Sequence, residues 1–403
     1  MSASGSGMGT WLLCVWLVVC RPVLMLWVTL QDPRKESVKS SSESGVISEA
    51  IQMLHEVFSI GEMPPNTIPQ RKPPQFMVDL FNAVADLDGI TKGYGLQQGN
   101  VVRSFEDKVR AQDQSYFYFN ISSAGKGERM LKAELRVFKL RQVSGSGRFH
   151  RHHFCRADVY ELLDSRVKPW RGNLISSRLL PLHSQGWEVF NVTQVVSRWL
   201  QDASSNYGFL IISTLPSGNS LDDHFMSFSR STPRKGSRTS PFLVLFSDDG
   251  RRRASNPSPE PGFPPSPADL PPLLPNQNID LKKIRQIRDL SMAAQHHHVS
   301  CQRVPLYVDF EEIGWEGWII SPRGYNAYHC RGACIFPLGQ GLGATNHATV
   351  QSIAHALKLS KDIDTPCCVP DKLHSINLLY FDDEENVVLK QYDEMVAVSC
   401  GCH

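Results

Sequence analysis

Seven cysteines lie in the last 103 residues of this 403-residue chain, and cysteine thiols can bind metal, exchange electrons or form crosslinks. They are Cys301, Cys330, Cys334, Cys367, Cys368, Cys400 and Cys402. A zinc site would pair one C-x2–4-C motif with another or with histidines, and only Cys330 and Cys334 have that spacing. The C-x-x-C spacing of redox motifs is absent from the sequence. Disulfides explain the cluster best, and the odd number predicts one cysteine that pairs between chains or stays reduced.

Disulfides persist in oxidising compartments, and the first residues of the chain predict export. Residues 11–20 form an apolar run of the length of a signal-peptide core, with a cleavage point expected after Cys20. A membrane anchor is the alternative, but Arg21 and Pro22 interrupt the apolar span near its middle. We therefore expect a secreted, extracellular protein without stable membrane insertion.

Composition and motifs exclude several classes of function. The hydrophobic content of 41% suffices for globular cores, and a net charge of +2 argues against nucleic-acid binding. The charge is uneven, because residues 289–403 hold 14 acidic and 7 basic residues. The G-x-S-x-G and H-E-x-x-H motifs of hydrolases are absent from the sequence. We expect no enzymatic activity and no cofactor.

The region before the cysteine cluster combines helix and strand patterns. Apolar residues at helical spacing predict a helix over 47–58, and a second short helix begins at Phe76. The segment from Trp187 is typical of a strand that passes into a helix. Runs of aromatic and β-branched residues predict strands of an antiparallel sheet within 116–122, 131–140, 207–214 and 241–249. Sequons at Asn120 and Asn191 predict surface glycosylation.

A Pro- and Ser-rich linker occupies residues 251–279, and basic clusters flank it at 251–253 and 282–288. Secretory convertases read the Arg directly before the cut and an Arg at the fourth position back from the cut, and Arg288 with Arg285 provides both. We expect cleavage after Arg288, with Arg253 as the alternative site. The predicted parts are a signal peptide (1–20), a prodomain (21–250), a linker with the cleavage sites (251–288) and a mature domain (289–403).

The motifs CRGAC, PCCVP and CGCH resemble the growth-factor domain of the transforming growth factor β superfamily. LYVDFEEIGWEGWIISPRGYNAYHC and NHATVQSIAHALKLS are similar to its bone morphogenetic protein branch, and the resemblance covers all of 301–403. Upstream, PPQFMVDLF, VVRSF, GWEVFNVTQVVSRWL and FLVLFSDD resemble the prodomain of the family. The resemblance implies a small, disulfide-rich β fold, a cystine-knot cytokine with one helix, after an α+β prodomain with an antiparallel sheet.

The resemblance also implies a disulfide pairing. Cys330–Cys400 and Cys334–Cys402 would close a ring, and Cys301–Cys368 would pass through it. Gly332 and Gly401 lie at the centres of the two ring segments, and we expect them to leave the middle of the ring open. Cys367 would join two copies into a disulfide-linked dimer.

The implied function is that of a dimeric growth factor that brings type I and type II serine/threonine kinase receptors together. The implied type I set is Trp315, Trp318, Phe336, Pro337, Leu338, Asn346, Val350 and Tyr392. The implied type II set is Ser321, Asn326, His374, Asn377, Leu378 and Leu389. The prodomain and extracellular antagonists are further expected partners, and helix 47–58 would cover the receptor surface. An extracellular cystine-knot antagonist that sequesters a related ligand is the alternative function.

Residues 346–359 predict a helix that Thr345 or Asn346 caps. Its apolar stripe of Val350, Ile353, Ala354 and Leu357 is by default a core face, whereas in the family it packs on the partner chain. Histidines at 296–298 and 150–153 offer no closed ligand set, so we expect no metal site. The acidic run 382–385 predicts a solvated turn between two strands rather than a calcium site.

Overall fold

The structure is a computed structural model, and its described residues lie mostly after residue 71. They are residues 52–54, 57–58, 72–93, 96, 99–108, 115–125, 127–141, 153–164, 171–214, 227–229, 239–251 and 299–403. The predicted signal peptide, most of helix 47–58, the cleavage site at 285–288 and the histidines at 296–298 lie outside them. The chain forms two compact units, residues 1–61 and 62–403, and all elements below belong to the second. No helix in the described part is long and apolar enough to cross a bilayer.

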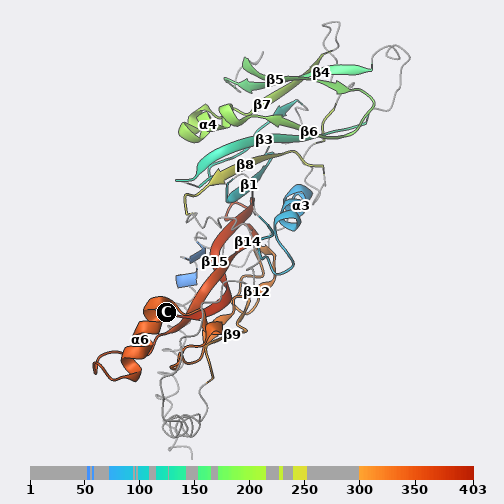
Figure 1. Cartoon of the computed structure of the whole chain (residues 1–403). Coiled ribbons are helices and arrows are strands. Elements are labelled where there is room, and N and C mark those ends of the chain that lie inside the picture. The colour runs from blue at the N-terminus through green and yellow to red at the C-terminus, as the bar shows by residue number, and fades with distance from the viewer. Residues whose placement is uncertain are drawn as a thin grey trace, which may run out of the picture. The chain divides into compact units, whose positions relative to one another are not determined.

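The predicted prodomain contains two antiparallel sheets (Figure 1). One sheet holds β1 (Val101–Glu106), β3 (Arg129–Lys139), β6 (Gly186–Asn191) and β8 (Phe242–Asp248). The other holds β2 (Tyr116–Phe117), β4 (Phe154–Leu162), β5 (Gly172–Pro181) and β7 (Phe209–Thr214). The prodomain helices in the described part after residue 71 are α3 (Gln75–Val84), α4 (Thr193–Gln201) and the short 3-10 helix η1 (Ala203–Ser205).

The prodomain core lies between these two sheets, because alternate residues of β3, β4, β7 and β8 point inward. Trp199 of α4 is fully buried there, with its ring centroid 4.6 Å from that of Phe209. Its indole N–H donates to the Glu161 carboxylate at 3.2 Å, so the one polar atom of the side chain is satisfied inside the core. The predicted strand-to-helix passage at Trp187 is present as β6 and α4.

The described part of the mature domain is mostly strand. Its elements are β9 (Gln302–Val304), β10 (Tyr307–Asp309), β11 (Ile319–Ser321), β12 (Gly324–Asn326), β13 (His329–Arg331), η2 (Gln340–Leu342), α6 (Asn346–Ala356), β14 (Cys368–Phe381) and β15 (Val387–Cys402). We call β14 and β15 together the finger hairpin; they pair antiparallel along most of their length. Figure 1 shows this hairpin in red, with α6 near the end that holds the cysteines. The disulfide-rich β fold with one α-helix is confirmed.

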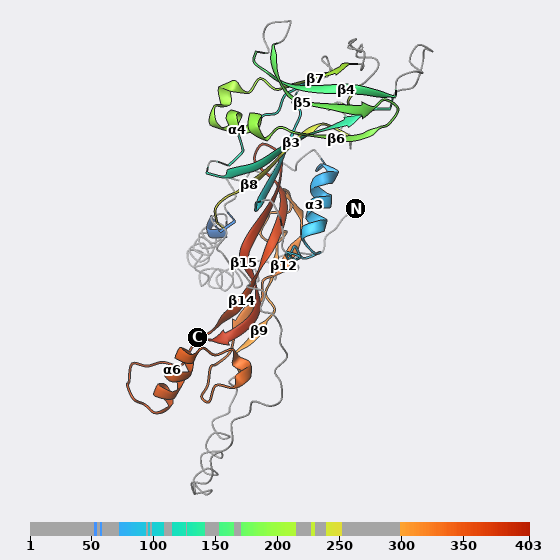
Figure 2. The same cartoon turned by 45° about the horizontal axis from the view of Figure 1, so that its top comes forward.

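One sheet crosses the boundary between the prodomain and the growth-factor domain, in the order β11-β14-β15-β1-β8-β3-β6. Strand β1 of the prodomain pairs antiparallel with β15, and Val102 lies opposite Leu389. Both views place α3 beside the finger hairpin (Figure 2). The sequence did not predict this pairing of prodomain and growth-factor strands, which the structure adds.

Candidate functional site

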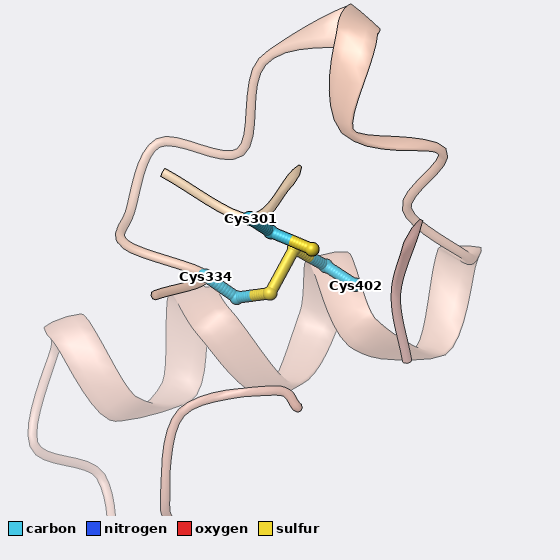
Figure 3. Close-up of side chains that lie close together, drawn as sticks. All are labelled: Cys301, Cys334 and Cys402. Carbon is cyan, nitrogen blue, oxygen red and sulfur yellow. A yellow bond between two sulfur atoms is a disulfide. The ribbon is translucent and has the colours of Figure 1, made fainter. Parts of the chain in front are cut away.

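The three disulfides of the structure are those that the resemblance implied. Cys301–Cys368, Cys330–Cys400 and Cys334–Cys402 have Cα atoms 5.5, 5.7 and 5.8 Å apart, as disulfides require. In Figure 3 the sulfur of Cys301 lies beside the Cys334–Cys402 bond. These three sulfurs are close enough for a metal site, but each already belongs to a disulfide. They brace the fold and provide no thiolate for zinc.

Gly332 permits a close approach of two backbone segments. It has a φ of +128°, and an added Cβ would collide with the Ser300 backbone and lie 2.7 Å from the Val299 carbonyl oxygen. The segment that leads into Cys301 passes directly over it, since the Ala333 N–H donates to Val299 at 2.9 Å. Gly332 is therefore needed for the close passage of residues 299–300, while the expectation that Gly332 and Gly401 leave the middle of the ring open stays a prediction.

Cys367 is exposed, and within the described residues it takes part in no disulfide. Its N–H donates to the His403 carbonyl at 2.8 Å, and the His403 N–H donates back at 2.9 Å. These two bonds extend the finger hairpin by one residue pair and fix the position of the thiol. Cys155, in contrast, is buried in the prodomain core, where its thiol faces the Leu180 carbonyl at 3.6 Å.

Helix α6 presents its apolar stripe to solvent. Thr345 caps it, because its hydroxyl accepts a hydrogen bond from the Ala348 N–H at 3.1 Å. Val350 is 65% exposed and Ile353 and Leu357 are also exposed, so the interpretation of the stripe as an ordinary core face is wrong for this chain. An exposed apolar stripe on a helix indicates a surface that another protein covers.

The predicted type I set divides into an exposed and a buried group. Phe336, Pro337, Asn346 and Val350 are exposed and Leu338 is half-buried. The buried members are Trp315, Trp318 and Tyr392. The rings of Trp315 and Trp318 pack at a tilt of 52° with centroids 5.2 Å apart, and Trp318 meets the ring of Tyr380 edge-on at 5.6 Å. The two tryptophans are thus packed side chains in this chain, while the loop at Phe336 is accessible.

The predicted type II set is spread over β11, β12, β14 and β15, and the prodomain covers part of it. Asn377 and Leu389 are fully buried, whereas His374 is exposed and Ser321 is half-buried. The Asn377 N–H donates to the carbonyl of Gly89 in the prodomain at 2.7 Å, and its side-chain amide donates to the Thr91 hydroxyl at 2.8 Å. Prodomain backbone and side chains therefore occupy the face of the finger hairpin that carries Asn377.

Leu378 of the predicted type II set lies on the opposite face of β14 from Asn377. Successive residues of a strand point to opposite faces, so Leu378 shares a face with Tyr380, and Asn377 shares the other face with Leu379. Tyr380 packs on Trp318, whereas Leu379 packs in the cluster under α3. Leu378 thus lies on the side of the tryptophans.

Asn326 of the type II set has a local structural role. Its side-chain oxygen accepts hydrogen bonds from the N–H groups of Leu306 at 3.0 Å and Tyr328 at 3.2 Å. Tyr328 has a φ of 52°, a left-handed conformation that this side-chain bond helps to hold. Asn326 is half-buried and shapes the loop before β13.

The apolar contact between the prodomain and the finger hairpin is a single core. From the hairpin it contains Leu379, Phe381, Val387 and Leu389. From the prodomain it contains Met77, Phe81, Val84, Ala85, Leu96, Val102, Phe242 and Val244. Removing this much apolar surface from water is the main favourable contribution to the contact. We call this cluster, with the β1–β15 pairing, the prodomain–finger interface.

A buried ion pair joins the two domains beside that core. Lys390 of β15 lies 3.1 Å from the carboxylate of Asp249, which directly follows β8. Burial raises the pKa of the Asp249 carboxyl, but hydrogen bonds from Asn100, Arg251 and Lys390 outweigh burial and bring it below its ordinary value. The carboxylate is therefore held in its charged form at neutral pH.

The tip of the finger hairpin is a turn, as predicted, but the prodomain covers part of it. Asp382 accepts hydrogen bonds from the N–H groups of Glu384 at 3.0 Å and Asn386 at 2.8 Å. Its second oxygen lies 4.0 Å from the guanidinium of Arg103 in the prodomain. Burial raises the pKa of the Asp382 carboxyl above its ordinary value, although hydrogen bonds from Asn386 and Ser123 and the charge of Arg103 oppose it. The prediction of a fully solvated turn is wrong for Asp382.

Sequence reasoning missed the residues that hold the prodomain on the finger hairpin, namely Gly89, Asn100, Arg103, Asp249 and Lys390. Gly89 follows Asp86-Leu-Asp88 in a turn pattern, and that pattern could have marked a tight loop. Arg103 and Lys390 lie in strands and Asp249 directly follows one, and a charge beside an apolar run can signal a buried pair. The partner of each charge is far away in sequence and left no local signal.

A three-disulfide knot with an exposed odd cysteine, produced behind a prodomain that shares its sheet, defines a cystine-knot growth factor made as a precursor. Two family models match the chain: the transforming growth factor beta like domain over residues 300–402, and the TGF-beta propeptide over residues 46–246. The chain therefore belongs to the transforming growth factor β family. Membership in a family of signalling ligands confirms the prediction that the chain is not an enzyme.

Curated relatives support the same assignment over most of the chain. Bone morphogenetic protein 4 of Suncus murinus is 33% identical over 76% of this chain and 72% of its own length. The proteins of the same name from Rattus norvegicus and Bos taurus are 31% and 32% identical, over 82% of this chain and 80% of theirs. These similarities confirm the predicted bone morphogenetic protein branch.

Proposed function

We propose that this chain is a precursor whose cleavage after Arg288 releases a secreted, Cys367-linked dimer, and that the dimer brings type I and type II receptor kinases together. One observation carries the dimer: the exposed thiol of Cys367 and the exposed stripe of α6 belong to the same small domain. A thin domain of this size buries little surface, so disulfides and a second copy supply stability.

The prodomain has a second role in this proposal, which is to cover part of the type II face until it dissociates. Asn377 and Leu389 are fully buried, and prodomain atoms contact both. The exposed type I residues around Phe336 have no such cover among the contacts of the described residues. Release of the prodomain would therefore expose the buried type II residues, and type II receptor binding and prodomain binding would exclude each other on that face.

The dimer is tested by mass analysis of the secreted protein with and without reduction. We expect a mature chain that begins at Asp289, with a disulfide between two Cys367 residues. The Cys367→Ser variant should run as a single chain without reduction and keep its three internal disulfides. The Cys155→Ser variant is the control and should still form the covalent dimer. A mature chain that begins at Ala254, or covalent dimers from the Cys367→Ser variant, would contradict the proposal.

The two receptor faces are tested by binding the purified dimer to receptor ectodomains. Phe336 and His374 are both exposed, so neither Phe336→Ala nor His374→Glu should unfold the domain. If each is a binding hot spot, we expect Phe336→Ala to weaken type I binding at least about tenfold and leave type II binding unchanged. His374→Glu should have the opposite selectivity. Equal losses on both receptors would refute two separate faces.

A further inference from the structure

The sequon at Asn120 contacts the tip of the finger hairpin. Its side-chain amide nitrogen, Nδ2, donates a hydrogen bond to Glu384 Oε2 at 3.4 Å. The hydroxyl of Ser122 donates to the other oxygen of Glu384 at 2.8 Å. One carboxylate of the growth-factor domain thus binds both side chains that define the sequon in the prodomain.

The same prodomain loop holds the turn at the tip through a second carboxylate. Ser123 Oγ donates to Asp382 Oδ2 at 3.0 Å, and the Asn386 side-chain amide donates to Ser123 Oγ at 3.0 Å. Because Asp382 also accepts hydrogen bonds from the backbone of the turn, the prodomain loop contacts a turn that its own hydrogen bonds already order. Residues 120–123 therefore form a small polar clamp on the finger tip, separate from the apolar prodomain–finger interface.

The orientation of the Asn120 carboxamide is fixed. The N–H of Ser122 donates to Asn120 Oδ1 at 3.2 Å, so the oxygen faces its own loop and Nδ2 faces Glu384. N-glycosylation forms a bond between Nδ2 and C1 of a lipid-linked oligosaccharide, breaks the C1–O bond to the lipid diphosphate and releases one amide proton. A sugar ring attached to Nδ2 is bulky, and Glu384 lies within hydrogen-bond distance of that atom.

The order of synthesis favours the sugar over the carboxylate. Asn120 precedes Glu384 by 264 residues, so the sequon enters the secretory pathway before the finger tip exists. We propose that an N-glycan on Asn120 and the carboxylate of Glu384 compete for the same amide nitrogen, so that glycosylation sets how tightly the prodomain clamps the finger tip. This inference goes beyond receptor assembly and does not depend on it.

The second sequon provides an internal control. Asn191 is exposed, and its Oδ1 accepts hydrogen bonds from the Thr193 N–H at 3.1 Å and the Thr193 hydroxyl at 2.7 Å. Both partners belong to the prodomain. A glycan at Asn191 should therefore leave the contact with the finger tip unchanged.

The test uses the full chain with Asn191→Gln, so that Asn120 is the only usable sequon. Protein is secreted from untreated cells and from cells in which lipid-linked oligosaccharide synthesis is inhibited. In each state, Glu384→Ala is compared with the unchanged residue and with Asp383→Ala, which removes a neighbouring exposed charge. After cleavage, the dissociation rate of the prodomain from immobilised growth factor is measured.

We expect Glu384→Ala to speed dissociation about tenfold in the unglycosylated protein, because it removes hydrogen bonds to a charged group. In the glycosylated protein it should change the rate by less than about twofold, and Asp383→Ala should have little effect in either state. An equal effect of Glu384→Ala in both states would overturn the competition. So would mass analysis that finds Asn120 unmodified in protein from untreated cells.

A second measurement needs only the glycosylated protein, in case the unglycosylated chain is not secreted. Amide hydrogen exchange is followed in residues 382–386 of the complex, with and without Glu384→Ala. The proposal predicts the same protection in both proteins, because the glycan has already displaced the carboxylate. Clearly higher protection with Glu384 in place would show that glycan and carboxylate bind together and would overturn it.

Discussion

Lys390 and Asp249 form an ion pair of 3.1 Å across the boundary between the growth-factor domain and the prodomain, with side chains that are 8% and 9% exposed. Removing one partner of a buried pair leaves the other charge without compensation, which costs about 3–5 kcal/mol. The pair therefore links the two domains by a contact that neither domain can satisfy alone.

We expect Lys390→Met to weaken retention of the cleaved prodomain more than about a hundredfold, because the Asp249 carboxylate stays buried without its cation. Asp249→Asn should weaken retention of the prodomain as well. In the double variant the loss of binding free energy should be smaller than the sum of the losses in the two single variants. The dissociation rate of the prodomain from the purified complex measures all three. Strictly additive effects would show that the two residues do not act as a pair.

Acid should release the prodomain only below the ordinary carboxyl range. The pKa of Asp249 is depressed, so its contribution to the complex is present above its ordinary pKa of about 4 and is lost as the pH falls through the depressed value. The pKa of Asp382 is raised, so its protonation relieves a cost as the pH falls and acts in the opposite direction. We expect stable retention from pH 7 to about 5 and release below about 4. Asp249→Asn should flatten this profile; release of the unchanged complex near pH 6 would contradict it.

A substitution at Gly89 tests how closely the prodomain approaches the face of the finger hairpin that carries Asn377. It has a φ of +76°, and an added Cβ would lie 2.9 Å from both the Asn377 carbonyl oxygen and Pro322 Cγ. Gly89→Ala should therefore weaken prodomain retention through both backbone strain and a steric clash. Gly93→Ala is the matched control, because Gly93 has a φ of +54° and open space around its Cβ position. Backbone strain alone costs about 1–2 kcal/mol and acts in both variants. Gly89→Ala should therefore weaken prodomain retention more than Gly93→Ala does, because only Gly89→Ala adds the clash. Equal weakening by the two variants would contradict a close contact between Gly89 and the backbone of Asn377.

The substitution Gly332→Ala tests the close approach of residues 299–300 to the knot. Gly332→Ala would force a Cβ against the backbone of residues 299–300, where no flexible side chain can yield. We expect secretion to fall more than about tenfold, since a clash in a rigid core exceeds the usual cost of a surface change. Gly339→Ala, at a position with open space, should be secreted normally. Normal secretion of Gly332→Ala with all three internal disulfides would refute this account of the glycine.

The features that the sequence predicted correctly leave local or compositional signals. The cysteine spacing with its glycines, the capped helix at Thr345 and the strand-to-helix passage at Trp187 are each readable within a short window. The antiparallel character of the prodomain sheet was readable in the same way. These signals were enough to predict the fold class and to predict one cysteine without a partner in the same domain.

The pairing of β1 with β15 was not readable, because its residues are separated by most of the chain and a strand sequence does not name its partner. Val102 and Leu389 look like ordinary core residues, and nothing in either window shows that they face each other. The face of β14 on which Leu378 lies was not readable for a different reason. A resemblance transfers residues by position, whereas the alternation of β14 decides which face each residue occupies.

The most direct measurement of the central claim is binding of the purified Asp289–His403 dimer to type I and type II receptor ectodomains, with and without the cleaved prodomain. The account predicts that the dimer binds both ectodomains at once and that added prodomain reduces type II binding far more than type I binding. A correctly disulfide-bonded dimer that binds neither ectodomain would contradict the proposed function. Simultaneous, undiminished binding of prodomain and type II receptor would contradict the proposed cover on Asn377 and Leu389.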